Sequence, residues 1–163
     1  MKSLIASIAI LGLVGMVVGI TASATDQASV TATVTVQNIS VVVTDGSISY
    51  GILAVGTATS TVGVDQQTAT NNGNVTENFN IRGQNTGCPW TLASSVGANT
   101  YKHEFSKDNG STWTAALTTS NQSLATSVAT SASQTFDLQI TTPTSSTCYN
   151  QQSVDVTVQV TAS

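Results

Sequence analysis

The sequence predicts an all-β protein, built as a single antiparallel β-sandwich of about 8–10 strands. Three observations lead to this fold class. Apolar and polar residues alternate with a period of two through most of the chain after residue 24. Turn-forming residues interrupt the alternation at 45–46, 71–74, 97–99 and 108–110. Thr and Ser together account for 49 of the 163 residues, whereas only 12 are Asp, Glu, Lys or Arg.

This composition excludes several classes of protein. The formal net charge is −4, so the basic surface that nucleic-acid binding requires is missing. Coiled coils and long exposed helices need many Glu, Lys and Arg residues, which the chain lacks. Hydrophobic residues make up 40% of the chain, as in ordinary folded domains rather than charge-driven disordered chains. The length suits one domain.

Residues 1–24 have the organisation of a secretory signal peptide. Lys2 precedes an apolar run from residue 4 to residue 20, and residues 22–24 (Ala-Ser-Ala) form a small-x-small cleavage pattern. The alternative is a retained N-terminal membrane anchor, although this run as a helix would span only about 26 Å of a ~30 Å hydrocarbon core. The sequence therefore predicts a hydrophobic leader helix, and a β domain over residues 25–163 that is secreted or held at the cell surface.

Nine segments of this domain have the pattern of strands. They cover residues 29–36, 38–44, 47–53, 75–81, 90–94, 101–105, 112–117, 134–141 and 154–160. Residues 54–70 support two interpretations, a weak strand near 64–69 or a surface loop.

The same alternation predicts which side chains form the core. On the first segment, Val30, Val34 and Val36 are expected to face inward. The other expected core residues are Phe79, Ile81, Trp90, Leu92, Phe105, Phe136, Leu138, Ile140, Val154, Val156, Val158 and Val160. Few of these side chains are large, so we expect thin packing that a disulfide would reinforce.

Cys88 and Cys148 are the two cysteines of the chain. An even pair in an exported protein predicts a disulfide. Closing a loop of roughly 60 residues would stabilise the fold by ~4 kcal/mol in the chain-entropy model. The alternative is two buried free thiols. A metal site is not expected, because the chain has one His and no CxxC spacing.

Residues 106–113 (SKDNGSTW) resemble an Asp-box, the S-x-D-x-G-x-T-W hairpin of sialidases and other secreted β proteins. Ser106, Asp108, Gly110, Thr112 and Trp113 occupy the motif positions. Asp108 is expected to accept backbone N–H bonds across the turn, Gly110 to adopt a positive φ, and Trp113 to pack under the hairpin. The resemblance implies a structural hairpin. It does not imply sialidase activity, because those enzymes carry several copies and an Arg cluster, whereas this chain has one copy and one Arg.

Two other segments are similar to small secreted surface proteins of uncultured bacteria. They are residues 44–51 (TDGSISYG) and 72–79 (NGNVTENF), and the similarity extends over most of the predicted mature domain. It implies secretion and an immunoglobulin-like sandwich, and it implies no assigned activity.

The sequence predicts no enzyme. His103 is the single histidine, and the strand pattern places it on one face with Tyr101 and Phe105, opposite Lys102 and Glu104. A lone strand histidine without an orienting acid is typical of a structural side chain rather than a general base. The eight carboxylates are scattered along the chain, and no spacing forces two of them together.

Calcium is the one cofactor for which the sequence has candidate ligands. Asp45 and Asp108 lie in turns near Gly residues, where carboxylate and carbonyl oxygens can converge on a hard cation. The alternative is that both side chains bond their own backbone as ordinary turn residues. No D-x-D-x-D pattern is present, so no metal site is predicted.

Two further features bear on binding at the surface. The aromatic residues that could form a sugar-stacking platform are Tyr50, Trp90, Tyr101, Trp113 and Tyr149, although strand positions favour both Trp as core or hairpin residues. Of these, Tyr149 is expected to be exposed. Candidate glycosylation sequons occur at Asn38, Asn74, Asn109 and Asn121, and their use would depend on the host.

The composition favours a structural protein of a surface coat or filament that assembles through β-strand pairing. We call residues 28–37 the donor segment: they are uncharged, follow the predicted cleavage site, and place Val30, Ala32, Val34 and Val36 on one face. The donor segment is part of the candidate donor or edge strand, residues 25–37. We expect it to complete the sheet of another subunit. The alternative is that it pairs within its own domain.

The second hypothesis is a secreted adhesin module that binds a carbohydrate or a cell surface through exposed aromatics. The expected partner is thus another copy of the chain or a glycan, with membrane contact only through an uncleaved leader. The scarcity of charge also predicts stability that depends little on pH or salt.

Overall fold

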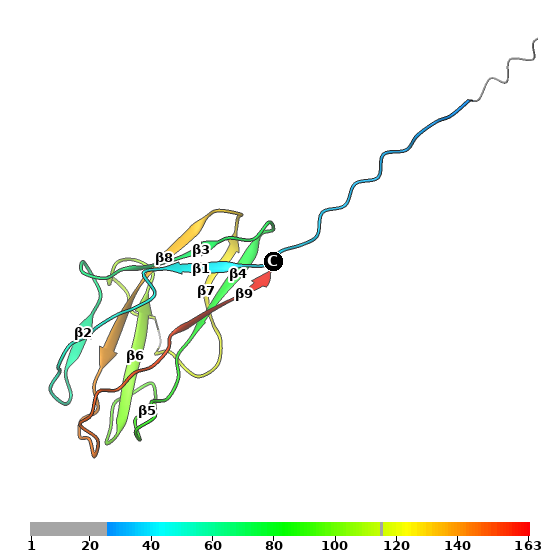
Figure 1. The fold of residues 1–163 in the computed structure, drawn as a ribbon. Helices are drawn as coiled ribbons and strands as arrows, with labels where there is room; N and C mark the ends of the chain where they lie inside the picture. Colours follow the sequence, from blue (N-terminus) through cyan, green and yellow to red (C-terminus); the bar gives the residue numbers. More distant parts are fainter. Residues whose placement is uncertain (1–25, 115) are drawn as a thin grey trace, which may run out of the picture. The chain divides into compact units, whose positions relative to one another are not determined.

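The computed structural model describes residues 26–114 and 116–163, and over these residues the chain contains strands and no helix (Figure 1). The strands are β1 (Val41–Thr44), β2 (Ala58–Ser60), β3 (Gln67–Asn71), β4 (Glu77–Arg82), β5 (Thr91–Leu92), β6 (Thr100–Ser106), β7 (Gln122–Val128), β8 (Ser133–Thr141) and β9 (Thr157–Ala162). This part of the chain accordingly has no helix long and apolar enough to cross a membrane. The predicted leader, residues 1–24, lies outside the described residues.

The strands form two sheets, and all but one of the pairings are antiparallel. The larger sheet has the order β1-β3-β8-β6-β5, and β2 also pairs with β8. The smaller sheet has the order β7-β4-β9. Only the short pair of β5 with β6 is parallel. The long strand β8 thus pairs with β3 through its first half and with β2 through its last residues.

Side chains from both sheets share one hydrophobic core, as a two-layer β protein requires. Its buried members are Ala69, Phe79, Ile81, Phe105, Leu117, Leu124, Val128, Phe136 and Leu138. The strict alternation of β4 and β6 explains this placement: residues 77, 79 and 81 are buried on β4, and residues 101, 103 and 105 on β6. The partly buried residues that pack against this core include Val156, Val158 and Val160.

Most of the predicted strands are present, with shifted ends. Segments 38–44, 75–81, 90–94, 101–105, 134–141 and 154–160 correspond to β1, β4, β5, β6, β8 and β9. The undecided stretch 54–70 contains β2 and the start of β3, while β7 was not predicted. Residues 47–53 lie outside the strands although they alternate between exposed and half-buried positions up to residue 51. Residues 112–114 and 116–117, the described part of the predicted segment 112–117, also lie outside the strands.

The prediction that the first segment supplies core side chains was wrong. Val30, Val34 and Val36 are 94%, 91% and 81% exposed, and residues 26–40 lie outside the nine strands. Residues 35–163 form one compact unit, and the chain up to residue 34 is grouped separately from it. Alternation alone gives a segment two faces, but burial of one face needs a partner strand. Residues 26–40 pair with no strand of the described chain.

The strand order also bears on the immunoglobulin-like assignment. We count β2 and β3 as one interrupted strand and leave out the short β5, so the strands in chain order are β1, β2/β3, β4, β6, β7, β8 and β9. In this order the second strand pairs with the sixth, because β3 pairs with β8. An immunoglobulin constant domain pairs its second strand with its fifth. The all-β, two-sheet class is confirmed, whereas the immunoglobulin-like connection is unconfirmed.

Candidate functional site

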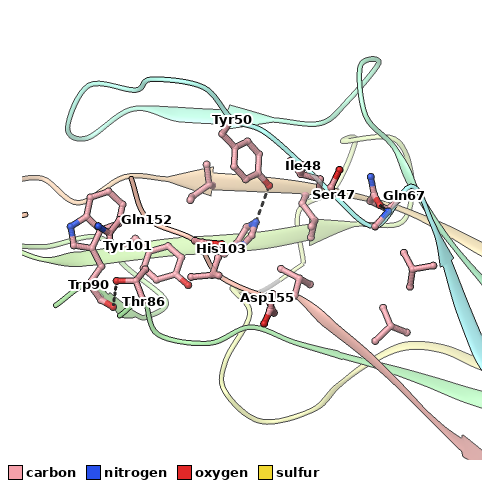
Figure 2. A pocket seen from close by; sticks show the side chains of 18 of the residues that line it. Ser47, Ile48, Tyr50, Gln67, Thr86, Trp90, Tyr101, His103, Gln152 and Asp155 are labelled. Carbon is pink, nitrogen blue, oxygen red and sulfur yellow. Dashed lines mark hydrogen bonds between the residues drawn. The ribbon is translucent and has the colours of Figure 1, made fainter. Parts of the chain in front are cut away.

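A groove of about 430 Å³ lies over the inner face of β6 and β8 (Figure 2). One wall is the segment 46–50 that follows β1, and the other is the segment 151–156 that leads into β9. The apolar residues that line it include Ile48, Phe136, Leu138, Ile140, Val154 and Val156. The volume lies within the range of sites that bind a ligand or a peptide segment.

Both walls of the groove are extended segments whose backbone N–H and C=O groups make no hydrogen bond to another strand of the described chain. Along residues 47–51 and again along 151–156, exposed and half-buried residues alternate, as they would on a strand. Within the described chain, residues 47–53 and 151–156 make no backbone–backbone hydrogen bond. Free N–H and C=O groups along an extended segment are a template for a further strand.

A part-buried hydrogen bond connects the floor of the groove to one wall. The Tyr50 hydroxyl lies 2.9 Å from Nε2 of His103, and the two rings meet edge to face at 5.8 Å (Figure 2). Burial lowers the pKa of His103 to about 4, so the ring is neutral at pH 7. Burial, followed by the charge of Asp65, raises the pKa of Tyr50. The pair is therefore a neutral polar contact in a groove that both apolar and polar side chains line.

The second ring nitrogen of His103 has no partner among the described residues. His103 is 2% exposed, and its Nδ1 is buried without a hydrogen bond. Its strand neighbours Lys102 and Glu104 lie on the opposite face, where they form a 2.8 Å salt bridge. The predicted arrangement of the two faces is thus confirmed. The hydrogen-bonded partner of His103 among the described residues is a tyrosine, whereas the orienting group of a Ser-His-Asp triad is an acid.

The aromatic residues considered as a sugar platform do not share one exposed surface. Tyr50, Trp90 and Tyr101 line the groove, and Tyr101 is buried with its hydroxyl donating to the carbonyl of Gln84. Burial raises the pKa of Tyr101 to about 12. Tyr149 is 85% exposed, as predicted, and neither it nor Trp113 lines the groove.

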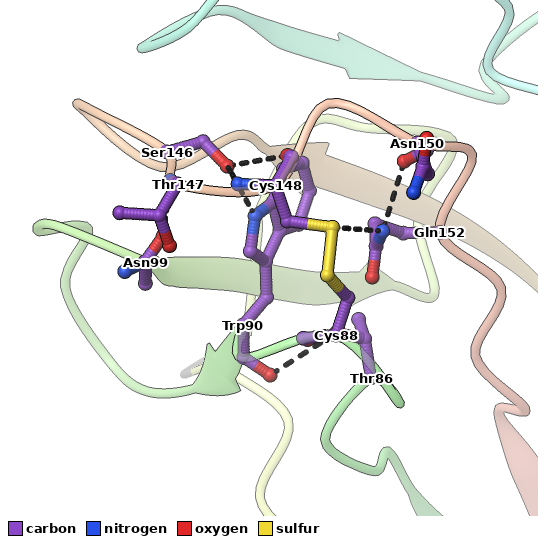
Figure 3. Close-up of a disulfide and its surroundings, with 9 residues drawn as sticks. All are labelled: Thr86, Cys88, Trp90, Asn99, Ser146, Thr147, Cys148, Asn150 and Gln152. Carbon is purple, nitrogen blue, oxygen red and sulfur yellow. Dashed lines mark hydrogen bonds between the residues drawn. A yellow bond between two sulfur atoms is a disulfide. The ribbon is translucent and has the colours of Figure 1, made fainter.

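The predicted disulfide between Cys88 and Cys148 is confirmed (Figure 3). It links the segment before β5 to the loop after β8, across 60 positions of sequence. Polar contacts surround it: Trp90 Nε1 donates to Ser146 Oγ at 2.8 Å, and Gln152 Nε2 lies 3.3 Å from the sulfur of Cys148. Since Gln152 also lines the groove, the disulfide is adjacent to one groove wall. An intramolecular disulfide is consistent with an oxidising or extracellular environment.

The Asp-box-like segment forms a tight polar turn after β6. The Asp108 carboxylate accepts from Ser106 Oγ at 2.7 Å and from the Thr112 amide at 2.8 Å, and it also accepts from the Thr112 hydroxyl. These hydrogen bonds, led by the Thr112 hydroxyl, lower the pKa of Asp108 to about 2. Gly110 has a φ of 78°, and its Cα faces Val62 and Trp113 so closely that a β-carbon would lie 2.7 Å from Val62.

The chain after this turn returns along β6 without becoming a strand. The Thr114 amide donates to the carbonyl of Phe105, and the Leu117 amide donates to the carbonyl of His103. Trp113 is half-buried. The motif is thus a capped turn with a short, irregular return segment rather than a regular hairpin.

The two candidate calcium ligands lie in separate turns. Asp45 adopts a φ of 74°. The pKa of Asp65 is raised, first by desolvation and then by the neighbouring Asp45 carboxyl. Asp108 is occupied by its own turn, as described above. Among the described residues no three His, Cys, Asp or Glu side chains are grouped as metal ligands. Asp45 and Asp108 stay untested as calcium candidates.

The chain before β1 is fastened to the loop between β3 and β4. Asn74 holds it twice: its Oδ1 accepts from the Asn38 amide at 2.7 Å, and its Nδ2 donates to the Val36 carbonyl at 2.9 Å. Glu77, which is fully buried, accepts from the Ser40 amide at 2.8 Å. We call these contacts the N-terminal anchor. They keep residues 36–40 extended, in line with β1.

All four sequon asparagines are exposed, and the side chains of Asn74 and Asn121 are hydrogen-bonded within the described chain. Asn74 belongs to the N-terminal anchor, Asn121 donates to Gln159 at 2.6 Å, and Asn109 has a φ of 56° within the Asp108 turn. Asn38 contributes its backbone to the anchor. Glycosylation itself stays a prediction.

Comparison of the chain with family models, with curated proteins and with solved structures returned no match. Functional inference therefore depends on the geometry of the chain itself. Sequence analysis missed the groove and the N-terminal anchor. The sequence signal for the N-terminal anchor was Glu77, which shares the inward-facing side of its strand with Phe79 and Ile81. A buried carboxylate needs hydrogen-bond partners. The groove had no local sign, because its walls come from opposite ends of the domain.

Proposed function

We propose that this protein is a non-enzymatic, extracellular structural subunit, of a surface coat or filament, that assembles through β-strand pairing. The predicted signal peptide, secretion to the cell surface and an immunoglobulin-like fold of the sandwich are parts of the same proposal. The disulfide between Cys88 and Cys148 supports an oxidising environment.

The observation that supports assembly is the state of the donor segment. Residues 28–37 combine a strand pattern with no charge, and Val30, Val34 and Val36 expose most of their surface. These valines lie on one face of the segment. Leaving each of them exposed costs about 1.5–3 kcal/mol relative to burying it. Pairing with another subunit removes that cost and satisfies the backbone of the segment at the same time.

A secreted adhesin module is the second candidate, and one observation favours it. Tyr149 is 85% exposed beside Cys148, in a loop held by the disulfide, which is a rigid position for a side chain that stacks on a sugar. A single exposed aromatic is a weaker basis than a whole unpaired segment. A glycan array with the exported protein, and with Tyr149→Ala as control, tests this alternative.

The assembly proposal is tested by removing or charging the donor segment. Deletion of residues 25–37 is expected to abolish polymers in negative-stain micrographs while the remaining domain stays folded by circular dichroism. Val34→Asp is expected to have the same effect, because a carboxylate cannot enter an apolar interface without a partner. Thr33→Asp is the matched control, since residue 33 lies on the other face of the segment. Polymers formed by the truncated chain would refute the proposal.

A further inference from the structure

The groove has the features of a sandwich that is short of one strand. Its floor is the inner face of the larger sheet, and its walls are the extended segments 46–50 and 151–156, whose backbones lack pairing partners in the described chain. The larger sheet has six strands and the smaller has three, so part of the larger sheet's inner face is not covered by a strand. A single extended segment would fill the cavity and pair with a wall.

A buried polar atom in the groove also lacks a partner. His103 lines the groove, is 2% exposed, and leaves Nδ1 without a hydrogen bond among the described residues (Figure 2). Such an atom costs about 1–3 kcal/mol when it is buried and unsatisfied. The backbone of an inserted strand offers both N–H donors and C=O acceptors, so it can satisfy Nδ1 in either tautomer.

We propose that this groove binds the donor segment of a second copy of the chain, with Val30, Ala32 and Val34 inserted over His103 and Leu138. This inference rests on the proposed assembly function and assigns the surface that receives the strand. Insertion places apolar side chains against the apolar floor, and the threonines between them face outward. Val36 is held at the N-terminal anchor of its own subunit, so the inserted part ends near residue 34.

The fold disfavours insertion of the donor segment into its own groove. The N-terminal anchor fixes residues 36–40 at the start of β1, beside the C-terminal end of the chain, where the Ser163 amide donates to Thr76. The groove walls instead follow the end of β1 and precede the start of β9. To reach its own groove, the chain would have to reverse direction within residues 27–35, which contain no Gly, Pro, Asn or Asp.

This arrangement predicts the form of the assembly. The N-terminal anchor lies at the start of β1 and near the end of β9, whereas the groove walls follow the end of β1 and precede the start of β9. Contact between two copies therefore uses two different surfaces, which is a heterologous interface. Because a donor and an acceptor remain free at the two ends of each pair, such contacts continue into a linear filament instead of closing a dimer.

Cysteine trapping between two full mature chains tests the proposal. One chain carries Ala32→Cys in the donor segment, and the other carries Ser47→Cys at the groove wall, where residue 47 is exposed. Under mild oxidation we expect a covalent dimer on non-reducing gels. As control, Ser123→Cys places an exposed thiol on β7, away from the groove. Docking holds thiols at mM effective concentration, so at about 10 µM protein the groove pair should cross-link roughly 100-fold faster than the control pair.

The outcomes separate this inference from the proposed function. Filaments in micrographs with equal cross-linking at residues 47 and 123 would refute the groove as acceptor and leave assembly intact. A chain with both Ala32→Cys and Ser47→Cys that closes only within itself would show that the segment fills its own groove, which also refutes the inference. Absence of filaments in the parent protein would refute the proposed function itself. Ser47→Trp is a second variant: it should block filament growth, whereas Ser123→Trp should not.

Discussion

The hydroxyl of Tyr50 and Nε2 of His103 lie 2.9 Å apart and connect the segment after β1 to the middle of β6. Residues 47–53 have no backbone pairing in the described chain, so this side-chain contact is one of the few polar links that hold them over the core. His103 is buried and neutral, and its other nitrogen is unsatisfied. A histidine in this state makes the domain sensitive to acid.

We predict that acid destabilises the domain through His103. Its pKa is about 4 in the folded chain and 6.5 when exposed, so between these values the unfolded chain binds a proton that the folded chain does not. The histidine therefore has no effect on the pH dependence above pH 6.5, and stability falls as the pH drops from 6.5 toward 4. The expected loss is about 2 kcal/mol at pH 5 relative to pH 8.

Urea unfolding of the wild type and of His103→Phe at both pH values measures this loss. The variant should lose the part of the pH dependence that comes from the imidazole. NMR gives a second measurement that does not require the variant to fold: the ring resonances of His103 should not titrate between pH 8 and pH 5. A ring that titrates near pH 6.5 would contradict the prediction. A loss of this size would also correct the expectation that stability depends little on pH.

A second prediction concerns the buried carboxylate of Asp137 on β8. Thr61 donates to Asp137 at 3.2 Å and accepts from the Leu138 amide at 2.9 Å, while Gln66 donates to the other carboxylate oxygen. Thr61→Val keeps the size of the side chain and removes both hydrogen bonds. It should lower the free energy of unfolding by about 1–3 kcal/mol, because a buried amide and a buried carboxylate each lose a partner.

The matched control for Thr61→Val is Thr59→Val on β2. No side-chain hydrogen bond of Thr59 is present in the described structure, and valine is as good a strand residue as threonine. Its effect is expected to stay within about 0.5 kcal/mol. Urea unfolding at pH 7 measures both variants, and equal effects at the two positions would show that the Asp137 contacts are not the cause.

The disulfide provides a third prediction. Replacing Cys88 and Cys148 by Ala opens a loop of 60 positions and should reduce the free energy of unfolding by about 4 kcal/mol in the chain-entropy model. The wild type unfolded in the presence of a reductant is the control and should match the double variant. A loss below about 1 kcal/mol would mean that the unfolded chain is already restricted between these two sites.

The local properties of the chain were predictable from sequence. The alternation identified the strands β4, β6, β8 and β9. On β4 and β6 it also identified the buried face, because side-chain direction on a strand depends on the parity of the position. Likewise, the Asp108–Gly110 turn depends on hydrogen bonds within six residues. The cysteine pairing followed from there being only two cysteines.

The tertiary structure decided which alternating segments find a partner. Residues 29–36 alternate without a fault and lie outside the strands, whereas β7, with the weaker pattern QSLATSV, is paired along β4. A strand exists only where a second backbone lies at hydrogen-bonding distance, and that depends on the whole path of the chain. For the same reason the groove, formed by residues 46–50 and 151–156, could not be predicted. By itself the sequence determined an uncharged segment with the alternation of a strand. Only the tertiary structure decided that residues 26–40 pair with no strand in the described chain and that segments 46–50 and 151–156 border a groove, because both depend on the path of the whole chain.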